Sequence, residues 1–317
     1  MASEGAIPGP ATVSAVIVNW NGEAVLPACL ESVFRSTHPL AEVIVVDNGS
    51  VDGSLALLSE RFADRVTVIR NERNLGAPRA RNQGIRRALA GGVDFVFTLD
   101  NDLTMAPDTI EVLVDVLRRN PDAAMAGALI LDQARPDVIL SAGHRINWTQ
   151  NLVKTLGANQ RFRGQFRGTW EVDYAGSGAL LTRAGYLRRY GAFDERYLGY
   201  GYEDTDFGFQ AVARGWKVLC CADARVWHRP HTGIGRYSYR KKYLEARNAV
   251  VFMKRHGNVF RWSKYLFYVL LGFGYAAVRE GLRGNFAGVR GKVRGFIDGL
   301  RGREDLAYRL LDPGESR

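Results

Sequence analysis

The sequence predicts an α/β protein with a mixed sheet flanked by helices, followed by a basic helical extension. Short β-branched runs alternate with helix-like stretches over the first 119 residues. These runs are continuously apolar, as expected for parallel strands that are buried on both faces. The excess positive charge lies at the other end of the chain, in a segment with helical apolar spacing.

The composition excludes several classes of protein. Apolar residues make up 46% of the 317 residues and charged residues 24%, which is ordinary globular usage and argues against wholesale disorder. The three cysteines, two of them adjacent, do not form a disulfide framework and fit a reducing compartment. Residues 1–12 are predicted to be a flexible leader without the features of a secretory signal, so we expect a cytoplasmic protein.

Strands and helices are expected to alternate through the first part of a domain that covers residues 13–235. The middle of this domain, residues 132–182, is less regular and predicts loops and mixed strands. A helix over 203–214 and a strand over 216–221 follow. The early strands are predicted at 13–19, 42–47, 66–70 and 94–100, and the helices between and after them at 23–35, 54–62, 78–90 and 107–119.

Residues 236–317 form the predicted basic amphipathic helical extension. They carry 18 Lys and Arg against seven Asp and Glu, whereas the whole chain has a net charge of +10. The uncharged stretch 265–278 is shorter than the ~20 apolar residues of a membrane span. Residues 281–303 mix apolar and basic side chains, which favours an interfacial helix on an anionic membrane surface. The alternative is a helix packed on the preceding domain with a solvated basic face.

Polar clusters follow the first two predicted strands, as NWNG at 19–22 and DNGS at 47–50. Ligands of open parallel sheets bind beyond the carboxyl ends of strands. No GxGxxG follows the first strand, which disfavours a dinucleotide fold. Asp47 could accept a hydrogen bond from the imide N–H of uracil or thymine, or it could only form an Asx turn.

The fourth strand ends in LDND, which delivers Asp100 and Asp102 to one place. Carboxylate oxygens suit Mg²⁺ or Mn²⁺, and such an ion would take its remaining ligands from a diphosphate and water. The alternative is an ordinary acidic loop. His228, after the last strand, could complete the metal shell with Asp102, or could be a satisfied core histidine.

Two further motifs carry charge at useful positions. In NERNLGAPRARNQG (71–84), Arg79 and Arg81 are candidates to pair with phosphate or with Asp100, unless the segment is only a surface turn before a basic helix face. In GYGYEDTDF (199–207), Glu203 and Asp204 begin a helix. The helix dipole keeps a carboxylate ionised there, which suits a general base, although simple capping is the alternative.

The motifs together resemble the family 2 glycosyltransferases of the GT-A fold, a Rossmann-like nucleotide-diphospho-sugar transferase fold. They are most similar to bacterial rhamnosyltransferases of cell-surface polysaccharide assembly. The resemblance covers about residues 13–231 and extends only loosely into YLEARNAVVFMKRH near the C-terminus. Its motifs, in order, are VIVNWNG, VVDNGSVDGS, NLGAPRARNQG, LDND, GSGALL, YGYEDTDF and WHRPH.

The resemblance implies an inverting transfer from a nucleotide-diphospho-sugar, dTDP-rhamnose or a UDP-sugar, to a glycan or lipid-linked glycan. Asp204 would be the catalytic base with Glu203 beside it, and Mn²⁺ or Mg²⁺ would be held by Asp100, Asp102 and His228. Asn101 departs from the pattern, since many relatives carry Asp there. The implied donor site comprises Asn19, Asn21, Asp47, Asn48, Gly76, Arg81, Asp100 and Asn101, and the sugar and acceptor side comprises Gly176, Ser177 and Gly178.

Two rival functions remain at this point. A sugar nucleotidyltransferase also needs a sheet and a metal, but usually opens with a Gly-rich basic loop, which NWNG is not. A non-catalytic nucleic-acid-binding protein would use the basic C-terminus, yet the first 235 residues are nearly neutral and contain no recognised nucleic-acid module. We therefore expect a peripheral protein on the inner face of the cell membrane that does not bind nucleic acid.

Overall fold

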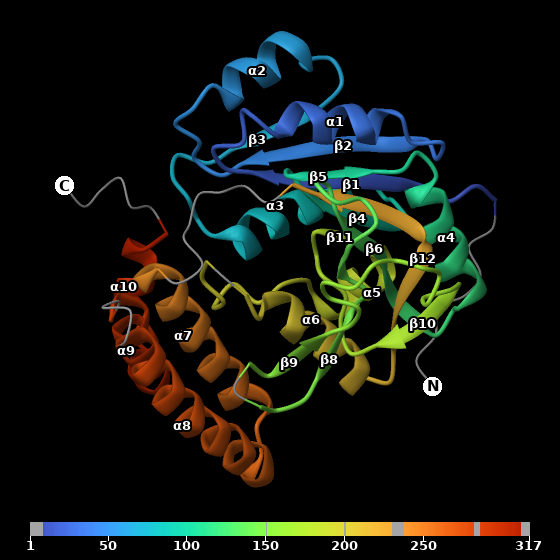
Figure 1. Cartoon of the computed structure of the whole chain (residues 1–317). Helices are drawn as coiled ribbons and strands as arrows, with labels where there is room; N and C mark the ends of the chain where they lie inside the picture. The colour runs from blue at the N-terminus through green and yellow to red at the C-terminus, as the bar shows by residue number, and fades with distance from the viewer. Residues whose placement is uncertain (1–8, 150, 200, 230–237, 282–285, 312–317) are drawn as a thin grey trace. The chain divides into compact units, whose positions relative to one another are not determined.

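The computed structural model describes residues 9–149, 151–199, 201–229, 238–281 and 286–311 (Figure 1). The chain divides into two compact units. The first unit comprises Met1–His144, Thr155–Phe193 and Phe207–His231, and the second comprises Arg145–Lys154, Asp194–Asp206 and Thr232–Arg317. The second unit therefore includes two segments that precede the predicted boundary at residue 235. That boundary lies outside the described residues, as does most of the predicted leader.

The elements follow the predicted alternation. The strands are β1 (Val13–Asn19), β2 (Leu40–Asp47), β3 (Thr67–Arg70), β4 (Phe95–Asp100), β5 (Leu103–Met105), β6 (Ala123–Asp132), β7 (Ile139–Ser141), β8 (His144–Ile146), β9 (Val153–Thr155), β10 (Thr169–Val172), β11 (Ala179–Arg183) and β12 (Lys217–His228). The helices are α1 (Leu26–Phe34), α2 (Ser54–Arg61), α3 (Ala77–Ala90), α4 (Thr109–Arg119), α5 (Ala184–Tyr190), α6 (Glu203–Ala213), α7 (Tyr239–His256), α8 (Val259–Gly281), α9 (Ala287–Arg301) and α10 (Asp305–Arg309).

The first unit contains the predicted mixed sheet. Its strands run in the order β10-β12-β6-β11-β4-β1-β2-β3, with β5 paired to β12 and β7 to β6. The four early strands are mutually parallel where they pair, and β11 is antiparallel to both β4 and β6. Strands β8 and β9 pair separately. The expectation of an α/β fold with a mixed, helix-flanked sheet is confirmed.

Both faces of the parallel part are covered, as the uninterrupted apolar strands predict. Side chains alternate along a strand, so Ala15 and Ile17 pack in a core with α1 and α4, whereas Val16 packs in a second core with α3. Figure 1 shows α1 and α3 on opposite sides of β1. Burial on both faces leaves the strand ends as the place where polar side chains can reach a ligand.

The register aligns those ends. In the parallel pairs Asn19 lies opposite Asp47, Asp47 opposite Arg70, and Val18 opposite Asp100. The polar residues that close these four strands, β1 to β4, therefore meet at the carboxyl edge of the sheet.

The last strand is longer than predicted. It was expected to end at residue 221, but β12 continues to His228, with an irregularity in its pairing to β6 between Cys221 and Arg225. The polar residues in this interval interrupt the apolar run, which hid the continuation. A bulge lets a strand absorb extra residues and resume its pairing. His228 is consequently the last residue of a strand and does not lie in a loop.

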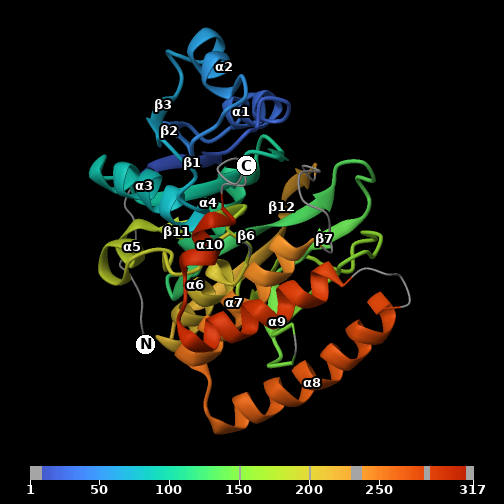
Figure 2. The same cartoon turned by 90° about the vertical axis from the view of Figure 1, so that its left-hand side faces the viewer.

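The second unit is helical after residue 238. Helix α9 lies along α7 (Figure 2), and its buried residues are Gly288, Gly291, Gly295, Gly299 and Asp298. A Cβ on Gly291 would lie 2.4 Å from Tyr239 O, and one on Gly295 would lie 2.1 Å from Tyr243 O. The two backbones are thus too close for any side chain at these positions. Among the described residues, no helix combines the length and hydropathy that a membrane span requires.

Gly295→Ala should separate α9 from α7, because its Cβ would meet a backbone carbonyl that cannot move away. We expect a loss of about 1–3 kcal/mol in the free energy of unfolding, measured by urea denaturation with circular dichroism. The matched control is Gly274→Ala in α8, where a Cβ meets nothing within 4 Å. That change should be neutral or stabilise by up to ~1 kcal/mol. Equal effects of the two substitutions would contradict the close packing.

Candidate active site

The acidic motif LDND sits where β4 ends and β5 begins, beside the end of β12. Strand β12 pairs antiparallel with β5 so that His228 lies opposite Leu103. This register places the imidazole next to Asp102, and His228 Nε2 lies 3.0 Å from Asp102 Oδ2. The backbone N–H of Arg229 also donates to Asp102 O at 2.9 Å. Strand pairing thus brings together the two predicted metal ligands that are 126 residues apart in the sequence.

Asp100 is held from a different direction. Arg81, a buried residue of α3, donates from Nη2 to Asp100 Oδ1 at 2.6 Å. The predicted Arg81–Asp100 pairing is therefore present. The other carboxylate oxygen faces Gly178, where a Cβ would lie 2.7 Å from Asp100 Oδ2. Asp100 keeps 39% of its side chain exposed, so a ligand can reach it.

The electrostatics favour cations around these acids. Burial opposes the charged form of His228, but the hydrogen bond to Asp102 and the negative charges of Asp102, Asp100 and Asp132 outweigh it and raise the pKa of His228. Cys29 Sγ lies 3.6 Å from Asp100 O. Burial, and then the charges of Asp102 and Asp100, raise the pKa of the Cys29 thiol well above its usual range.

Asn19 connects the ends of three strands. Its Nδ2 donates to Asp47 Oδ2 at 3.0 Å and to Ser50 Oγ at 3.2 Å, and its Oδ1 accepts from Asn101 Nδ2 at 2.8 Å. An amide at position 101 can donate this bond, whereas a carboxylate there could not unless protonated. Asn101 therefore fastens the acidic motif to β1.

Asp47 is fully buried, and both of its carboxylate oxygens accept hydrogen bonds within the protein. Oδ2 accepts from Asn19, and Oδ1 accepts from the backbone N–H of Ser50 at 2.9 Å. Asp47 therefore stabilises the turn after β2, although the N–H that it accepts from lies three residues on and not two, as in an Asx turn. Recognition of a base by Asp47 would need local movement that exposes the carboxylate.

Asn48 organises the loop before α3. Its Oδ1 accepts from Asn71 Nδ2 and from the backbone N–H of Leu75, both at 3.1 Å, and its Nδ2 donates to Asn74 Oδ1 at 2.9 Å. The loop ends at Gly76, whose φ of +86° favours glycine. This amide network was missed because amides in a loop carry no periodic signal. The residues it adds to the predicted set are Ser50, Asn71, Asn74 and Gln83.

Two of the predicted site residues, Asn21 and Ser177, form hydrogen bonds that stabilise the local backbone. Asn21 has φ of +50°, and its Oδ1 accepts from the backbone N–H of Val51 at 2.9 Å. Ser177 is fully buried, and its carbonyl oxygen accepts from Thr98 Oγ1 at 2.7 Å. Of the predicted GSG segment (residues 176–178), Gly178 is the part that borders the acidic motif. Its carbonyl also accepts from the backbone N–H of Asp100 at 3.0 Å.

The predicted base lies in the second unit, at the start of α6. Glu203 is buried and Asp204 half-buried, both in the first turn. A residue that sequence reasoning missed anchors this turn. Asp206 is fully buried and accepts from His256 Nε2 at 2.6 Å, from Arg255 Nη1 at 3.0 Å and from the Tyr197 hydroxyl at 3.1 Å. Asp206 is the third acid of the EDTD motif, and its position there is the feature of the sequence that could have identified it.

The donor atoms present fit a divalent cation only in part. Asp102 and His228 offer a carboxylate oxygen and an imidazole nitrogen side by side, a pair that Mn²⁺ accepts. No group of three His, Cys, Asp or Glu residues in the described chain could hold a metal on its own. Asp100 shares one oxygen with Arg81. The protein would therefore supply part of the shell, and a ligand with phosphate oxygens the rest.

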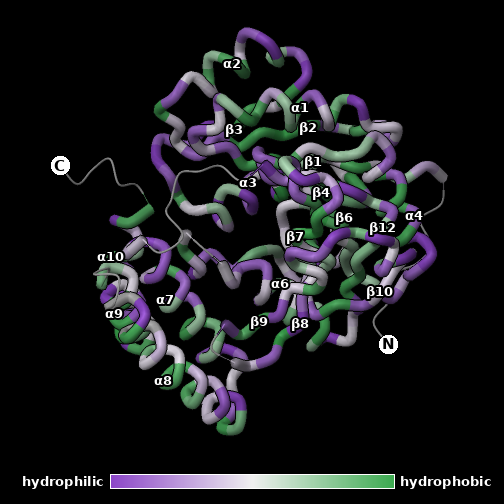
Figure 3. Tube along the Cα trace, viewed as in Figure 1, coloured by the Kyte–Doolittle hydropathy of each residue, from purple (hydrophilic) through white to green (hydrophobic). Residues whose placement is uncertain are grey.

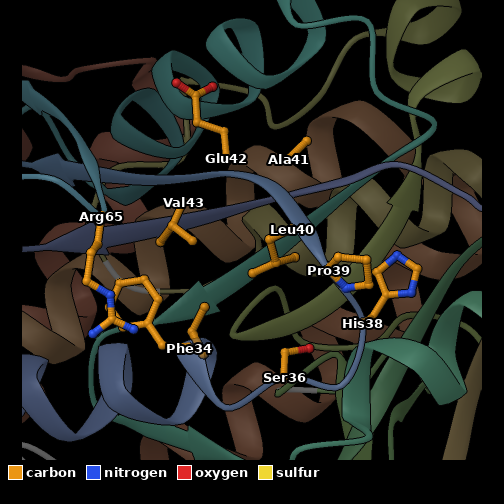
Figure 4. A pocket seen from close by; sticks show the side chains of 10 residues that line it. Phe34, Ser36, His38, Pro39, Leu40, Ala41, Glu42, Val43 and Arg65 are labelled. Carbon is orange, nitrogen blue, oxygen red and sulfur yellow. The ribbon is translucent and has the colours of Figure 1, made fainter.

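A surface pocket of about 350 Å³ lies elsewhere in the first unit (Figure 4). It opens at the amino end of β2, whereas the predicted donor residues lie at the carboxyl ends of the strands. Its wall includes Arg65, whose guanidinium carbon lies 3.6 Å from the centre of the Phe34 ring. None of the predicted site residues lines it, so we assign it no part in the chemistry.

The family model described as Glycosyl transferase family 2 matches residues 14–191, more than half of the chain. This chain belongs to glycosyl transferase family 2. The family identity makes it a glycosyltransferase and disfavours both the sugar nucleotidyltransferase and the nucleic-acid-binding alternatives. The matched residues contain the acidic motif and Arg81, but neither His228 nor the acidic start of α6.

Relatives and solved structures agree with the assignment. The N-acetylglucosaminyl-diphospho-decaprenol L-rhamnosyltransferase of Mycobacterium tuberculosis is 28% identical over 241 residues, 70% of this chain and 77% of the relative. GalNAc-T7, solved with UDP, GalNAc and Mn²⁺, superposes with a TM-score of 0.63 at 20% identity over 96% of this chain and 58% of that chain. The mannosyltransferase PcManGT from Pyrobaculum calidifontis, solved with GDP-Man and Mn²⁺, gives 0.60 at 16% identity over 94% and 89%. These similarities establish the GT-A fold.

The pKa values of two histidines of the first unit should be shifted in opposite directions in the metal-free protein. Folding raises the pKa of His228, so its stabilising effect is present below pH 6.5 and is lost as the pH rises through the folded value. Burial lowers the pKa of His144 to about 4, so stability falls as the pH drops from 6.5 towards 4. NMR titration of the imidazoles, assigned with H228N and H144N, measures both. A His228 pKa below 6.5 would contradict the Asp102 contact.

Proposed function

We propose that this chain is an inverting transferase that moves a sugar from a nucleoside-diphospho-sugar to a hydroxyl of a lipid-linked glycan. The acceptor oxygen bonds to the anomeric carbon while the bond from that carbon to the diphosphate oxygen breaks. The electron pair leaves with the nucleoside diphosphate, and Asp204 takes the hydroxyl proton. Attack opposite the leaving group inverts the anomeric configuration.

The observation that carries the donor part is the juxtaposition of Asp102 with His228 beside the Arg81–Asp100 pair. These groups lie at the strand ends where open sheets bind ligands. Asp102 and His228 would hold Mn²⁺ or Mg²⁺, with Asp100 as the further predicted ligand. When bound, the ion supplies positive charge that stabilises the diphosphate leaving group. Arg81 would exchange part of its contact with Asp100 for a phosphate oxygen.

The remaining predicted donor residues shape this site through the loops they hold. Asn19 and Asn101 fix the acidic motif to β1, and Asn48 fixes the loop that ends at Gly76. We propose that a uracil or thymine base binds along the edge formed by Asn19 and Asp47. The preference for these bases rests on the Asp47 carboxylate, which would have to rearrange to meet the base.

Asp204 is proposed as the base because of its position in α6. A carboxylate in the first turn of a helix is kept ionised by the dipole, and Glu203 beside it is more buried. Asp206 fixes the same turn through His256 and Arg255. A base needs this kind of positioning, because proton transfer depends on the distance to the acceptor hydroxyl.

The acceptor class is proposed from the relative in Mycobacterium tuberculosis, whose name gives a diphospho-decaprenol acceptor and a rhamnosyl transfer. By analogy dTDP-rhamnose is the first donor to test here, followed by UDP-hexoses. The acceptor would be a sugar on a lipid diphosphate at the inner face of the membrane. Gly178 would border the transferred sugar, since it lies against Asp100.

A membrane-bound acceptor agrees with the surface of the second unit. Helix α8 buries Tyr265 and Val269 but exposes Phe267, Leu270 and Leu271, the last two by 71% and 57%. Figure 3 shows hydrophobic residues recurring along α8. Helix α9 behaves similarly. It packs through glycines, as the packed-helix alternative requires, yet three of its large apolar side chains are exposed, as an interfacial helix requires. These outward residues of α9 are Val293, Ile297 and Leu300.

We therefore propose that α8 and α9 lie in the interface of an anionic bilayer. Apolar side chains would enter the headgroup boundary, and the basic excess of residues 236–317 would attract anionic lipid. Such an exposed apolar surface, rimmed by polar residues, marks an interaction site. The sequence predicted the interfacial helix at residues 281–303, but α8 has the longer exposed apolar face. We therefore propose that α8 makes the larger contact with lipid.

Asp204→Asn should lower turnover by about 10²–10⁴-fold, because the amide cannot take the acceptor proton. Metal-dependent release of nucleotide from dTDP-rhamnose or UDP-sugars, in the presence of acceptor, measures the rate. Calorimetry with the nucleoside diphosphate and Mn²⁺ should give binding within about twofold of the parent protein.

Asp102→Ala is the contrasting variant. It removes a proposed metal ligand, so nucleoside diphosphate and Mn²⁺ should both bind more weakly in calorimetry. Unchanged Mn²⁺ binding in the Asp102 variant would show that Asp102 does not bind the metal.

Unchanged turnover in the Asp204 variant would show that Asp204 is not the catalytic base.

Liposome flotation tests the membrane contact. The protein should float with vesicles containing anionic lipid and should be partly released by salt. Replacing both Phe267 and Leu271 by Asp should abolish flotation, whereas Val51→Asp, at a 91% exposed position of the first unit, should not. If the Phe267 and Leu271 variant floats like the parent, or if the parent does not float, the interface lies elsewhere. A change from dimer to monomer in that variant would instead indicate that the face pairs two copies.

A further inference from the structure

The second unit contains an aromatic cluster next to the proposed base, made of Trp148, Tyr202, Phe252, His256 and Arg261. The rings of Trp148 and Phe252 stack at 5.8 Å between centroids, and Tyr202 lies 6.2 Å from Phe252. His256 lies 4.8 Å from Phe252, and the guanidinium carbon of Arg261 lies 4.2 Å from the Trp148 ring. Phe252 is fully buried, while Trp148 and Tyr202 are half-buried and reach the surface.

The backbone around this cluster is unusual. Of the described non-glycine residues, five have positive φ, and three of these are Trp148 (+57°), Leu152 (+57°) and Tyr202 (+74°). The Tyr202 hydroxyl donates to Asn151 O at 3.3 Å, so two of the strained segments are joined. Such conformations cost energy and tend to persist at ligand sites, where the surrounding structure enforces them. The strain therefore marks the cluster as a candidate binding site.

The position of the cluster relates it to the acceptor. Tyr202 directly precedes Glu203 and Asp204 in the sequence, and His256 contacts Asp206 at 2.6 Å. A ligand held by Tyr202 would lie within a few residues of the proposed base. The exposed parts of aromatic rings offer sugar rings an apolar surface, and a Tyr hydroxyl adds a polar contact. The chemistry therefore suits a carbohydrate.

Arg261 adds an anion-binding group. Its Nη1 donates to His256 O at 2.7 Å, which fixes the guanidinium against Trp148. A guanidinium carries five N–H donors in a planar arrangement that matches phosphate oxygens. Arg261 also lies in the first turn of α8, the helix with the exposed apolar face. Half-buried aromatic rings, an arginine and a helix with an exposed apolar face thus follow one another within the second unit.

We propose that this aromatic cluster binds the head group of the acceptor, a sugar joined through diphosphate to a lipid. Trp148 and Tyr202 contact the sugar, Arg261 contacts the diphosphate, and the lipid chain continues along α8. This assignment rests on the proposed function for the identity of the acceptor. It differs from the sequence-based expectation, which placed the acceptor side at residues 176–178.

The test is direct binding of farnesyl-diphospho-N-acetylglucosamine, a short-chain analogue of the acceptor named for the Mycobacterium tuberculosis relative. Calorimetry on the full chain should show that Trp148→Ala and Arg261→Ala each weaken its binding at least about tenfold. Trp148→Phe should keep most of the affinity. Binding of the nucleoside diphosphate should stay within about twofold, because its proposed site lies in the first unit.

Arg189→Ala is the matched control, because Arg189 also lies over an aromatic ring, that of Tyr190 at 5.1 Å, but in the first unit. It should bind the analogue like the parent. The proposal is overturned if the parent does not bind the analogue, or if Trp148→Ala and Arg261→Ala bind it as tightly as the parent. If they weaken binding but no nucleotide-sugar donates to the analogue, the site stands and the proposed transfer fails.

Discussion

The alignment of three parallel strand ends is the constraint on which the proposed donor site depends. Because β4, β1 and β2 pair in register, Asp100, Asn19 and Asp47 close the strands at one edge. Strands buried on both faces can expose functional side chains only at their ends. The antiparallel pairing of β12 with β5 then adds His228 from the far end of the first unit. Backbone hydrogen bonds, which are stronger constraints than loop packing, thus set the distance between Asp102 and His228.

Hydrogen bonds between polar side chains also hold these strand ends in place. Asn19 is bonded to Asp47, Ser50 and Asn101, and Asn48 to the loop before α3. A buried amide without partners would be costly, so these networks admit few alternative arrangements. They act as a rigid frame around the more exposed carboxylate of Asp100. Several predicted donor residues therefore form hydrogen bonds with other protein groups, although they lie where we propose that the donor binds.

Much of the fold could be predicted from the sequence, because continuous apolar strands separated by helices leave few architectures. The order of motifs also identified the Arg81–Asp100 and Asp102–His228 neighbours. Other features had no local signal. The extension of β12 crosses polar residues, and the amide network depends on loop geometry. The role of Asp206 follows from its contact with His256, which lies 50 residues later in the sequence. The aromatic cluster joins two segments that no periodicity connects.

The glycine face of α9 has a consequence for how the protein can evolve. Because α9 approaches α7 most closely at Gly291 and Gly295, substitutions at the exposed positions Val293, Ile297 and Leu300 would leave that backbone contact intact. The proposed contact with lipid could therefore change through surface substitutions, without disturbing how α9 packs on α7.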